Sequence, residues 1–313
     1  MSTAAPARSH RALKPPKARR GSSQSRQSRA AWILALPFML LFTIFTAWPV
    51  ISSLYMSMTD IKSRDLRSPF AVSFVGLDNY VRVFSDETFR KSAFNTAYFV
   101  VIGVPLTLGI ALAAAIALDK GITRFRTLFR VGYYTPVVTS IVAVAVVWRF
   151  LLQPDSGLVN TVLGWVGING PDWLGSTATS MPSLIVMASW RNFGTAMIIF
   201  LAGLQSVPVM LHEAAAIDGA STWQRFRHIT LPMLRPTMLF VTVTTGIGYV
   251  QVFEEPFVMT KGGPLDSTIT MSMYTYKQFG FGNYGFAASM SYVLFVIIVA
   301  LTALQFRALR SNT

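Results

Sequence analysis

The sequence predicts an all-α membrane protein that crosses the bilayer six times. Of its 313 residues, 52% are hydrophobic and 13% carry a charge, which is far more apolar than a soluble domain of this length. Several apolar runs approach or exceed the ~20 residues that a helix needs to cross the hydrocarbon core. The chain has no cysteine, which excludes disulfides and thiolate metal sites. Six spans can be drawn, at approximately 31–54, 94–118, 131–152, 182–204, 233–257 and 286–306.

A basic tail precedes the first span. Residues 1–29 hold eight of the 27 Lys and Arg residues and no acid. This tail cannot bury a core, and we predict a disordered cytoplasmic segment that contacts anionic lipid heads. A signal peptide also begins with basic residues, but the apolar run from Ala30 is too long for one, so we expect an uncleaved first span. An RNA-binding arm is the alternative for the tail. The predicted organisation is a tail at 1–29, a membrane domain at 30–307 and a C-terminal tail at 308–313.

The charges of the connections predict the orientation of the spans. The connections after the second and fourth spans and the C-terminal tail are basic, whereas the connection after the third span has no Lys or Arg. The basic residues are Lys120, Arg124, Arg126, Arg130, Arg225, Arg227, Arg235, Arg307 and Arg310. By the positive-inside rule, both termini and the connection at 205–235 face the cytoplasm.

The connection at 205–235 has the features of a folded segment. Gly219 is placed to end a first short helix in a left-handed conformation. Ser221 and Gln224 have the spacing of a capping box, which begins a second helix, and Pro232 ends it. We therefore predict two short helices joined at a glycine turn.

The first of these helices carries a surface suited to docking. Ala214, Ala215 and Ala216 leave a smooth, shallow surface on which the backbone of another protein can come close. Glu213 beside them offers a carboxylate to an Arg or Lys of a partner. A plain connection without a partner is the alternative.

The same residues resemble a known motif. The order Glu213-Ala214-Ala215, then Asp218-Gly219, then Ile229-x-Leu231-Pro232 resembles the EAA loop of the membrane subunits of bacterial ABC importers. The longer pattern Glu-Ala-Ala-x-x-Asp-Gly-Ala, followed by Phe-x-x-Ile-x-Leu-Pro, is similar to that of the sugar-permease branch, which includes maltose and glycerol-3-phosphate permeases. The resemblance implies the type I ABC importer permease fold, in which this loop is a coupling helix that docks on a separate ATPase. The implied docking residues are Glu213, Ala214, Ala215, Asp218 and Gly219. The residues implied to attach the loop to the next span are Ile229, Leu231 and Pro232.

Motifs in other connections extend the resemblance over residues 32–306. Residues 74–80 resemble the Phe-x-Gly-Leu-x-Asn-Tyr signature that follows the first span of sugar permeases, and here a glycine turn should lead to an amphipathic helix on the membrane surface. Residues 260–264 resemble the Thr-x-Gly-Gly-Pro turn after the fifth span. Residues 157–160 and Trp173-Leu174 recur between the third and fourth spans of the same group. The extra N-terminal spans and large outer domain of the maltose-type subunit have no counterpart in this sequence.

The resemblance also implies partners. We expect a second, distinct permease subunit, an ATPase dimer that binds ATP and Mg, an extracytoplasmic solute-binding protein, and a sugar or oligosaccharide as substrate. This chain itself is expected to hold no metal or other cofactor and to catalyse no reaction, since it has no GxxxxGK[ST] loop and its histidines form no cluster. Its place is the bacterial cytoplasmic membrane, and no nucleic acid is expected as a partner.

Polar side chains inside the fourth and fifth spans predict a substrate pathway, because each is costly in a bilayer unless it is paired or faces water. Trp190 can stack on a sugar, while Arg191 can bind its hydroxyls or snorkel to the surface. Thr245 and Tyr249 are four residues apart and share a helix face. Aligned with the maltose-type family, Asn192, Thr195, Thr245 and Tyr249 are implied to contact the sugar. The predicted pathway residues are Trp190, Arg191, Asn192, Thr195, Thr245, Tyr249 and Gln251.

Glu254 and Glu255 form a candidate outer gate, or a pair with Arg191, or simply a solvated pair. Glycerol phosphate is the alternative substrate, since Arg191 suits its charge. A secondary transporter is the alternative class. It would need an acidic relay inside the membrane or an inverted repeat, and the sequence shows neither.

Overall fold

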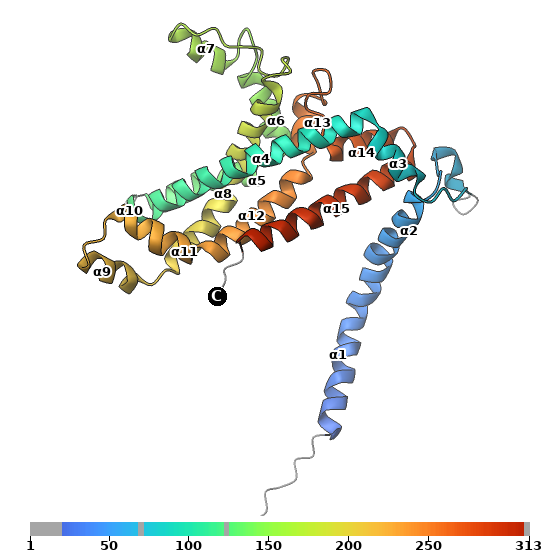
Figure 1. Cartoon of the computed structure of the whole chain (residues 1–313), viewed down its shortest axis with the longest axis horizontal. Helices are drawn as coiled ribbons and strands as arrows, with labels where there is room; N and C mark the ends of the chain where they lie inside the picture. Colours follow the sequence, from blue (N-terminus) through green and yellow to red (C-terminus); the bar gives the residue numbers. More distant parts are fainter. Residues whose placement is uncertain (1–20, 68–71, 122–124, 310–313) are drawn as a thin grey trace, which may run out of the picture. The chain divides into compact units, whose positions relative to one another are not determined.

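The computed structural model describes residues 21–67, 72–121 and 125–309 and divides the chain into two units, 1–53 and 54–313 (Figure 1). Of the two predicted tails, residues 1–20 and 310–313 lie outside the described part. Residues 21–29, predicted as part of the disordered tail, are instead helical, since α1 begins at Gly21 and continues into the first span. Five described helical stretches are long and apolar enough to cross a membrane, and a bent helix pair makes a sixth when it is counted as one span. The predicted six-span all-α fold is confirmed in this form. The stretches are 31–57, 87–119, 180–205, 235–259 and 284–308, with the bent pair at 127–151.

The first unit is helical. It contains α1 (Gly21–Phe42), the π-helical turn η1 (Thr43–Ala47) and the start of α2 (Trp48–Ser57). Its large apolar side chains are exposed, with Trp32 at 63% and Phe45 at 73%. Such a helix needs lipid or another protein chain as its surroundings.

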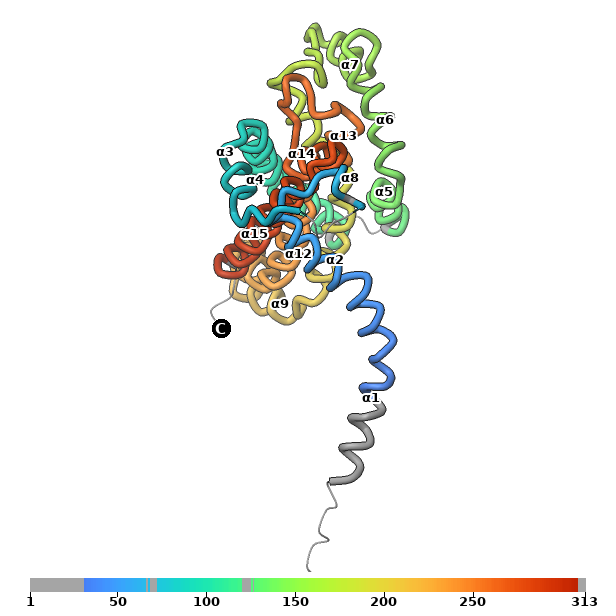
Figure 2. The backbone as a smooth tube through the Cα atoms, turned by 90° about the vertical axis from the view of Figure 1, so that its right-hand side faces the viewer, coloured from blue at the N-terminus to red at the C-terminus, as the bar shows by residue number. Residues whose placement is uncertain are grey.

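Long helices form the bundle of the second unit. They are α4 (Glu87–Ile116), α8 (Ser180–Gln205), α12 (Arg235–Val250) and α15 (Tyr284–Leu309). α8 packs along α4, and α12 contacts α4, α8 and α15 (Figure 2). Asp86 begins α4, because its carboxylate accepts a hydrogen bond of 2.7 Å from the backbone N–H of Phe89. Buried apolar side chains such as Phe99, Leu184 and Met197 fill the space between these helices.

The third span differs from the straight helix predicted at 131–152. It consists of α5 (Arg126–Val138) and α6 (Ile141–Leu151), which meet at an angle of 98°. Thr139 and Ser140 between them have extended backbone angles, so the helical hydrogen bonding stops there. α5 packs against α8, whereas α6 packs against α13 (Glu254–Met259). The sequence pattern missed the break because the two helices together are long and apolar enough to count as one span.

One end of the bundle carries a cap formed by α3 (Asp78–Ser85), α14 (Met271–Gly280) and the loop at 260–270. The predicted glycine turn is present, since Gly76 has a φ of +59°. The predicted helix after it is amphipathic: Val83 is fully buried and clusters with residues at the start of α15, while Val81 and Phe84 are exposed. α3 therefore packs on the protein with one face and leaves the other for the membrane surface or a partner.

Hydrogen bonds from buried side chains to distant backbone join the parts of the cap. The Asn79 amide donates to the carbonyl oxygens of Ser57 and Thr59, at 2.9 and 2.8 Å. The Asn95 amide on α4 donates to the carbonyls of Asp266 and Ile269, each at 2.9 Å. The first pair of bonds gives the Asn of the signature at residues 74–80 a structural role.

A tyrosine on α14 ties the cap to the start of α4. The Tyr274 hydroxyl donates to the Asp86 carboxylate at 3.1 Å. Burial and the neighbouring charge of Asp86 raise the pKa of Tyr274, so the hydroxyl keeps its proton and its role as a donor.

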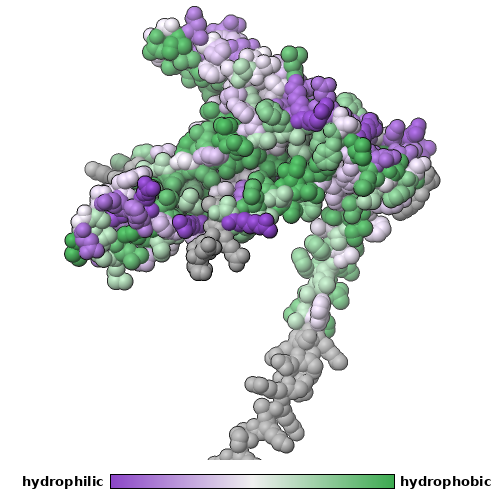
Figure 3. Space-filling view, in the orientation of Figure 1, coloured by the Kyte–Doolittle hydropathy of each residue, from purple (hydrophilic) through white to green (hydrophobic). Residues whose placement is uncertain are grey.

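The opposite end of the bundle carries the connection between α8 and α12, with α9 (Val209–Ile217), α10 (Thr222–Arg225), the π-helical turn η4 (Phe226–Thr230) and α11 (Leu231–Met233). The π-helical turn η3 (Ala117–Gly121) ends α4 near it, and η2 (Ser63–Arg67) and α7 (Leu158–Trp165) lie in other connections. Figure 3 shows apolar side chains along the bundle and polar side chains gathered at its two ends.

Candidate functional site

The connection at 205–235 folds as helical segments on either side of a glycine turn, as predicted. The prediction that Pro232 ends the second segment was wrong, because Pro232 lies in the first turn of α11, where its missing N–H interrupts no helical hydrogen bond. Gly219 has a φ of +79°, which few side chains tolerate, and it ends α9. The Ser221 backbone N–H donates to the Gln224 side chain at 2.7 Å, and the Gln224 N–H donates to the Ser221 hydroxyl at 3.3 Å. This capping box begins α10. We call residues 205–235 the α9–α11 loop.

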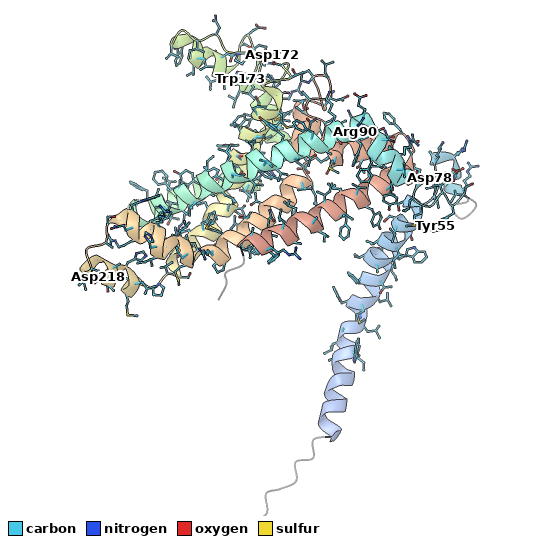
Figure 4. The ribbon with its side chains drawn as sticks, viewed as in Figure 1. Tyr55, Asp78, Arg90, Asp172, Trp173 and Asp218 are labelled. Carbon is cyan, nitrogen blue, oxygen red and sulfur yellow. The ribbon has the colours of Figure 1, made fainter. Side chains whose placement is uncertain are left out.

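The α9–α11 loop presents its predicted docking residues outward. Glu213, Ala214, Asp218 and Gly219 are exposed, and Figure 4 shows Asp218 at the tip of the loop. Ala215 is half-buried and borders a hollow of about 360 Å³. The walls of the hollow are formed by Ala215, Asp218, Gly219, Ala220, Gln224, Arg225, His228 and Ile229.

The predicted attachment residues lie where the loop joins α12. Ile229, Leu231 and Pro232 are half-buried, and the neighbouring Leu234 is fully buried in the core between α4, α8 and α12. The loop is thus anchored at this point and exposed at its tip.

A cavity of about 480 Å³ lies between α8, α12 and the start of α13. Six of the seven predicted pathway residues line it, together with both glutamates of the candidate gate. These residues are Arg191, Asn192, Thr195, Thr245, Tyr249, Gln251, Glu254 and Glu255. The structure therefore brings together side chains that lie up to 64 residues apart in the sequence, counted from Arg191 to Glu255.

Arg191 and the glutamates give the cavity its charges. The Arg191 Nη1 atom contacts the Asn192 Oδ1 atom at 3.4 Å, and its buried Nε atom has no hydrogen-bond partner among the described residues. Glu255 is 8% exposed at the start of α13, while Glu254 beside it is exposed. The cavity thus holds one guanidinium and two carboxylates, and no surplus of positive charge.

Trp190 is the pathway residue that the structure places elsewhere. Its ring packs against Trp148 of α6, with the centroids 5.7 Å apart, and it borders an apolar groove along α5 and α6. Successive residues of a helix point about 100° apart, and Trp190 precedes Asn192 by two residues. The two side chains therefore point to nearly opposite sides of α8. The predicted stacking of Trp190 on a substrate in this cavity therefore does not follow from the structure.

Tyr249 lines the cavity but is 5% exposed. Its hydroxyl is 2.7 Å from the Thr107 hydroxyl on α4, in the direction of the protein core. Tyr249 therefore joins the wall of the cavity to α4.

Comparison with known proteins identifies the family. Residues 103–310 match the family described as binding-protein-dependent transport system inner membrane component. The chain belongs to this permease family.

Relatives and a solved structure cover nearly all of this permease. The lactose transport system permease protein LacF of Rhizobium radiobacter is 35% identical over 287 residues, which cover 90% of this permease and 94% of LacF. The arabinooligosaccharides transport system permease protein AraP of Halalkalibacterium halodurans is 33% identical, over 89% of this permease and 87% of AraP. A crystal structure of a bacterial ABC transporter involved in the import of the acidic polysaccharide alginate matches with a TM-score of 0.76 and 25% identity, over 93% of this permease and 98% of that chain. The predicted resemblance to sugar permeases of ABC importers is confirmed, and so is the fold that it implied.

Two further motifs of the family resemblance meet in the structure of the permease. The indole N–H of Trp173 donates to the Asn160 Oδ1 atom at 2.6 Å, and the Asn160 amide donates to the Pro154 carbonyl at 2.9 Å. Figure 4 labels Trp173 close to Asp172, whose carboxylate accepts from the Gly175 N–H at 2.8 Å. These bonds hold together the loop that follows α6.

Sequence reasoning missed some residues at both sites of the permease. Thr244, Gly248 and Phe253 also line the cavity. Thr244 and Gly248 have the same four-residue spacing as Thr245 and Tyr249, which was a usable signal. At the α9–α11 loop, Met210 and Ile217 are 74% and 87% exposed, although both are strongly apolar. Exposed apolar side chains of this size are typical of a surface that another protein covers.

Proposed function

We propose that this permease forms, with a second and different permease, the pathway by which an ATP-driven importer carries an uncharged sugar or oligosaccharide into the cell. The observation that carries the proposal is the cavity between α8 and α12. Its volume of about 480 Å³ is in the range of small-molecule sites, and its amide and hydroxyl side chains both donate and accept hydrogen bonds. Relatives named for lactose and arabinooligosaccharides support this class of substrate.

The proposed roles in the cavity follow from side-chain chemistry. Arg191, Asn192 and Gln251 donate to sugar hydroxyls, and the hydroxyls of Thr195 and Thr245 exchange hydrogen bonds with them. The rings of Tyr249 and Phe253 offer faces for the apolar side of a sugar ring. Glu254 and Glu255, at the start of α13, form a gate at this end of the cavity.

The charges of the cavity favour an uncharged substrate over glycerol phosphate. Arg191 alone would attract a phosphate, but Glu254 and Glu255 line the same cavity. Like charges at close range in a site of low dielectric cost several kcal/mol unless they are compensated, as an order of magnitude. An uncharged saccharide avoids this cost and still uses every polar group.

A separate protein chain supplies the energy for transport. The sequence has no GxxxxGK[ST] loop, so ATP and Mg are expected on a separate ATPase dimer, and this chain is no enzyme. The exposed tip of the α9–α11 loop, with Glu213, Ala214, Ala215, Asp218 and Gly219, docks on that ATPase. Its anchor at Ile229, Leu231 and Pro232 passes the motion to α12, which lines the cavity. Two arrangements of the bundle, each favoured by one ATPase state, then open the cavity to either side in turn.

The orientation and the remaining partners follow from this assignment. The α9–α11 loop and both termini lie in the cytoplasm, in agreement with the positive-inside rule. The cap lies outside, where a solute-binding protein delivers the sugar. The exposed apolar side chains of the first span face lipid and the second permease.

Uptake of labelled compounds by cells that express the whole importer tests the proposal. Lactose, trehalose and arabinotriose serve as uncharged probes, and glycerol 3-phosphate serves as the charged probe. We expect uptake of at least one uncharged probe that depends on ATP and on the binding protein, and little uptake of glycerol 3-phosphate. Preferred uptake of glycerol 3-phosphate would overturn the substrate class. Uptake that continues without the ATPase, driven by an ion gradient, would show a secondary transporter instead.

A further inference from the structure

An aromatic ring forms part of the cavity wall on the side of α4. No residue of α4 lines the cavity, and Tyr249 of α12 lies between that helix and the cavity. The position of this ring therefore decides how wide the cavity is on that side.

Three residues of α4 hold the Tyr249 ring in place. The Thr107 hydroxyl lies 2.7 Å from the Tyr249 hydroxyl, and Thr107 is fully buried. The Phe99 ring packs against the Tyr249 ring at a tilt of 59°, with the centroids 5.1 Å apart. Between them, Gly103 is buried directly under the ring edge.

The absence of a side chain at Gly103 is what lets the ring approach α4. A Cβ atom at this position would lie 2.8 Å from Cε2 and 3.0 Å from Cδ2 of Tyr249, and 3.6 Å from Cγ2 of Ile185. Both distances to the Tyr249 ring are shorter than a carbon–carbon contact of about 3.5 Å allows. The ring is flat and rigid, so it must move as a whole rather than bend away.

We propose that Gly103 and Thr107 are positioning residues that set the width of the cavity, and hence the size of the saccharide, by fixing the ring of Tyr249. The proposal rests on the proposed function of the cavity. The direction of the effect follows from the packing. α4 with Phe99 blocks one side of the ring and Ile185 of α8 lies beside it, while the cavity is the side with free volume. A methyl group at position 103 therefore moves the Tyr249 ring toward the cavity, which makes the cavity narrower.

The substitution Gly103→Ala, compared with Gly109→Ala, tests this proposal. Both glycines lie on α4, but a Cβ atom at Gly109 would meet nothing within 4 Å. In the whole importer, competition by unlabelled mono-, di- and trisaccharides against a labelled transported probe gives the apparent affinity for each length. We expect Gly103→Ala to weaken the apparent affinity for the longest accepted saccharide by about threefold to tenfold, as an overpacked contact would. The apparent affinity for the shortest saccharide should fall less. Gly109→Ala should leave the profile unchanged.

Substitutions of Thr107 test the same idea without adding volume at the ring. Thr107→Val keeps the shape of the side chain but removes the hydroxyl that lies 2.7 Å from the Tyr249 hydroxyl, whereas Thr107→Ser keeps a hydroxyl at this position. We expect Thr107→Val to shift the length preference and Thr107→Ser to retain it. If Gly103→Ala fails to assemble in the membrane, this pair decides the question.

The outcomes separate this inference from the proposed function. If the unsubstituted importer takes up no saccharide probe, the proposed function fails and this inference fails with it. If it takes up a probe, and the Gly103→Ala and Thr107→Val importers assemble with an unchanged length profile, only the inference is overturned. A uniform loss of uptake for all lengths, in proportion to the amount of protein, also overturns it, because it would show a purely structural role.

Discussion

The cap and the α9–α11 loop lie at opposite ends of the same helix bundle and are held in opposite ways. In Figure 4, Asp78 marks the cap and Asp218 marks the loop. In the cap, the buried amides of Asn79 and Asn95 bond to backbone carbonyls of distant segments. In the loop, the capping box of α10 is local, and Ile217 stays 87% exposed. The difference shows that contacts between distant segments hold the cap, whereas the capping box of the loop joins residues only three apart, which is consistent with the proposed docking of the loop on an ATPase.

The largest expected effect is at the loop. We expect Glu213→Ala or Gly219→Ala to abolish uptake of every sugar while the permease stays in the membrane. Glu213 is exposed, and a side chain at the left-handed position of Gly219 costs only about 1 kcal/mol, so neither change should unfold the chain. Uptake assays together with immunoblots of the membrane fraction measure both quantities.

Gly167 offers a matched control for the loop. It also has a positive φ, of 76°, and a Cβ atom there would meet nothing within 4 Å, as at Gly219. Gly167→Ala should therefore cost the same strain but leave uptake intact. Normal uptake in both Glu213→Ala and Gly219→Ala would remove the docking role of the loop.

The next effect is expected between the two ends, in the cavity. Asn192→Ala should weaken the apparent affinity for the transported sugar by about tenfold, as the loss of one or two hydrogen bonds would. In the proposed function the loop drives transport of all sugars and the cavity selects among them, so Asn192→Ala should change the order of preference within a panel of saccharides. An unchanged order, measured by competition, would argue against the proposed pathway.

Substitutions in the cap should have a smaller effect on uptake, because they mainly lower the stability of the folded permease. Asn79→Ala removes two hydrogen bonds and leaves two buried carbonyls without this donor, at a cost of about 2–3 kcal/mol. Gln224→Ala in the loop removes the exposed capping box and should cost no more than about 1 kcal/mol. Thermal unfolding of the purified complexes compares the two, and an equal loss of stability would contradict the contrast between cap and loop.

The smallest effect is expected from the basic tail. Deletion of the residues before Arg26 should scarcely change uptake, because this segment is too poor in apolar residues to form a folded core. A loss of uptake with normal insertion, seen by uptake assay and membrane fractionation, would show that the tail takes part in transport.

The sequence by itself determined the features that depend on local pattern. The length of the apolar runs predicted the spans, and the spacing of Ser221 and Gln224 predicted the start of α10. The four-residue spacing of Thr245 and Tyr249 placed both on one wall of the cavity. Each of these follows from interactions within a few residues along one helix, or from the thickness of the bilayer.

The tertiary structure decided which way helices face and what they meet. The break at Thr139 and Ser140 leaves α5 to pack on α8 and α6 on α13, which no apolar pattern within the span could reveal. Trp190 looked like a partner of Asn192 but packs against Trp148, and Tyr249 packs against a glycine that lies 146 residues earlier, at position 103. The physical reason is that contacts between helices depend on their relative rotation and distance of approach, which are set by the packing of whole surfaces rather than by the sequence of one segment.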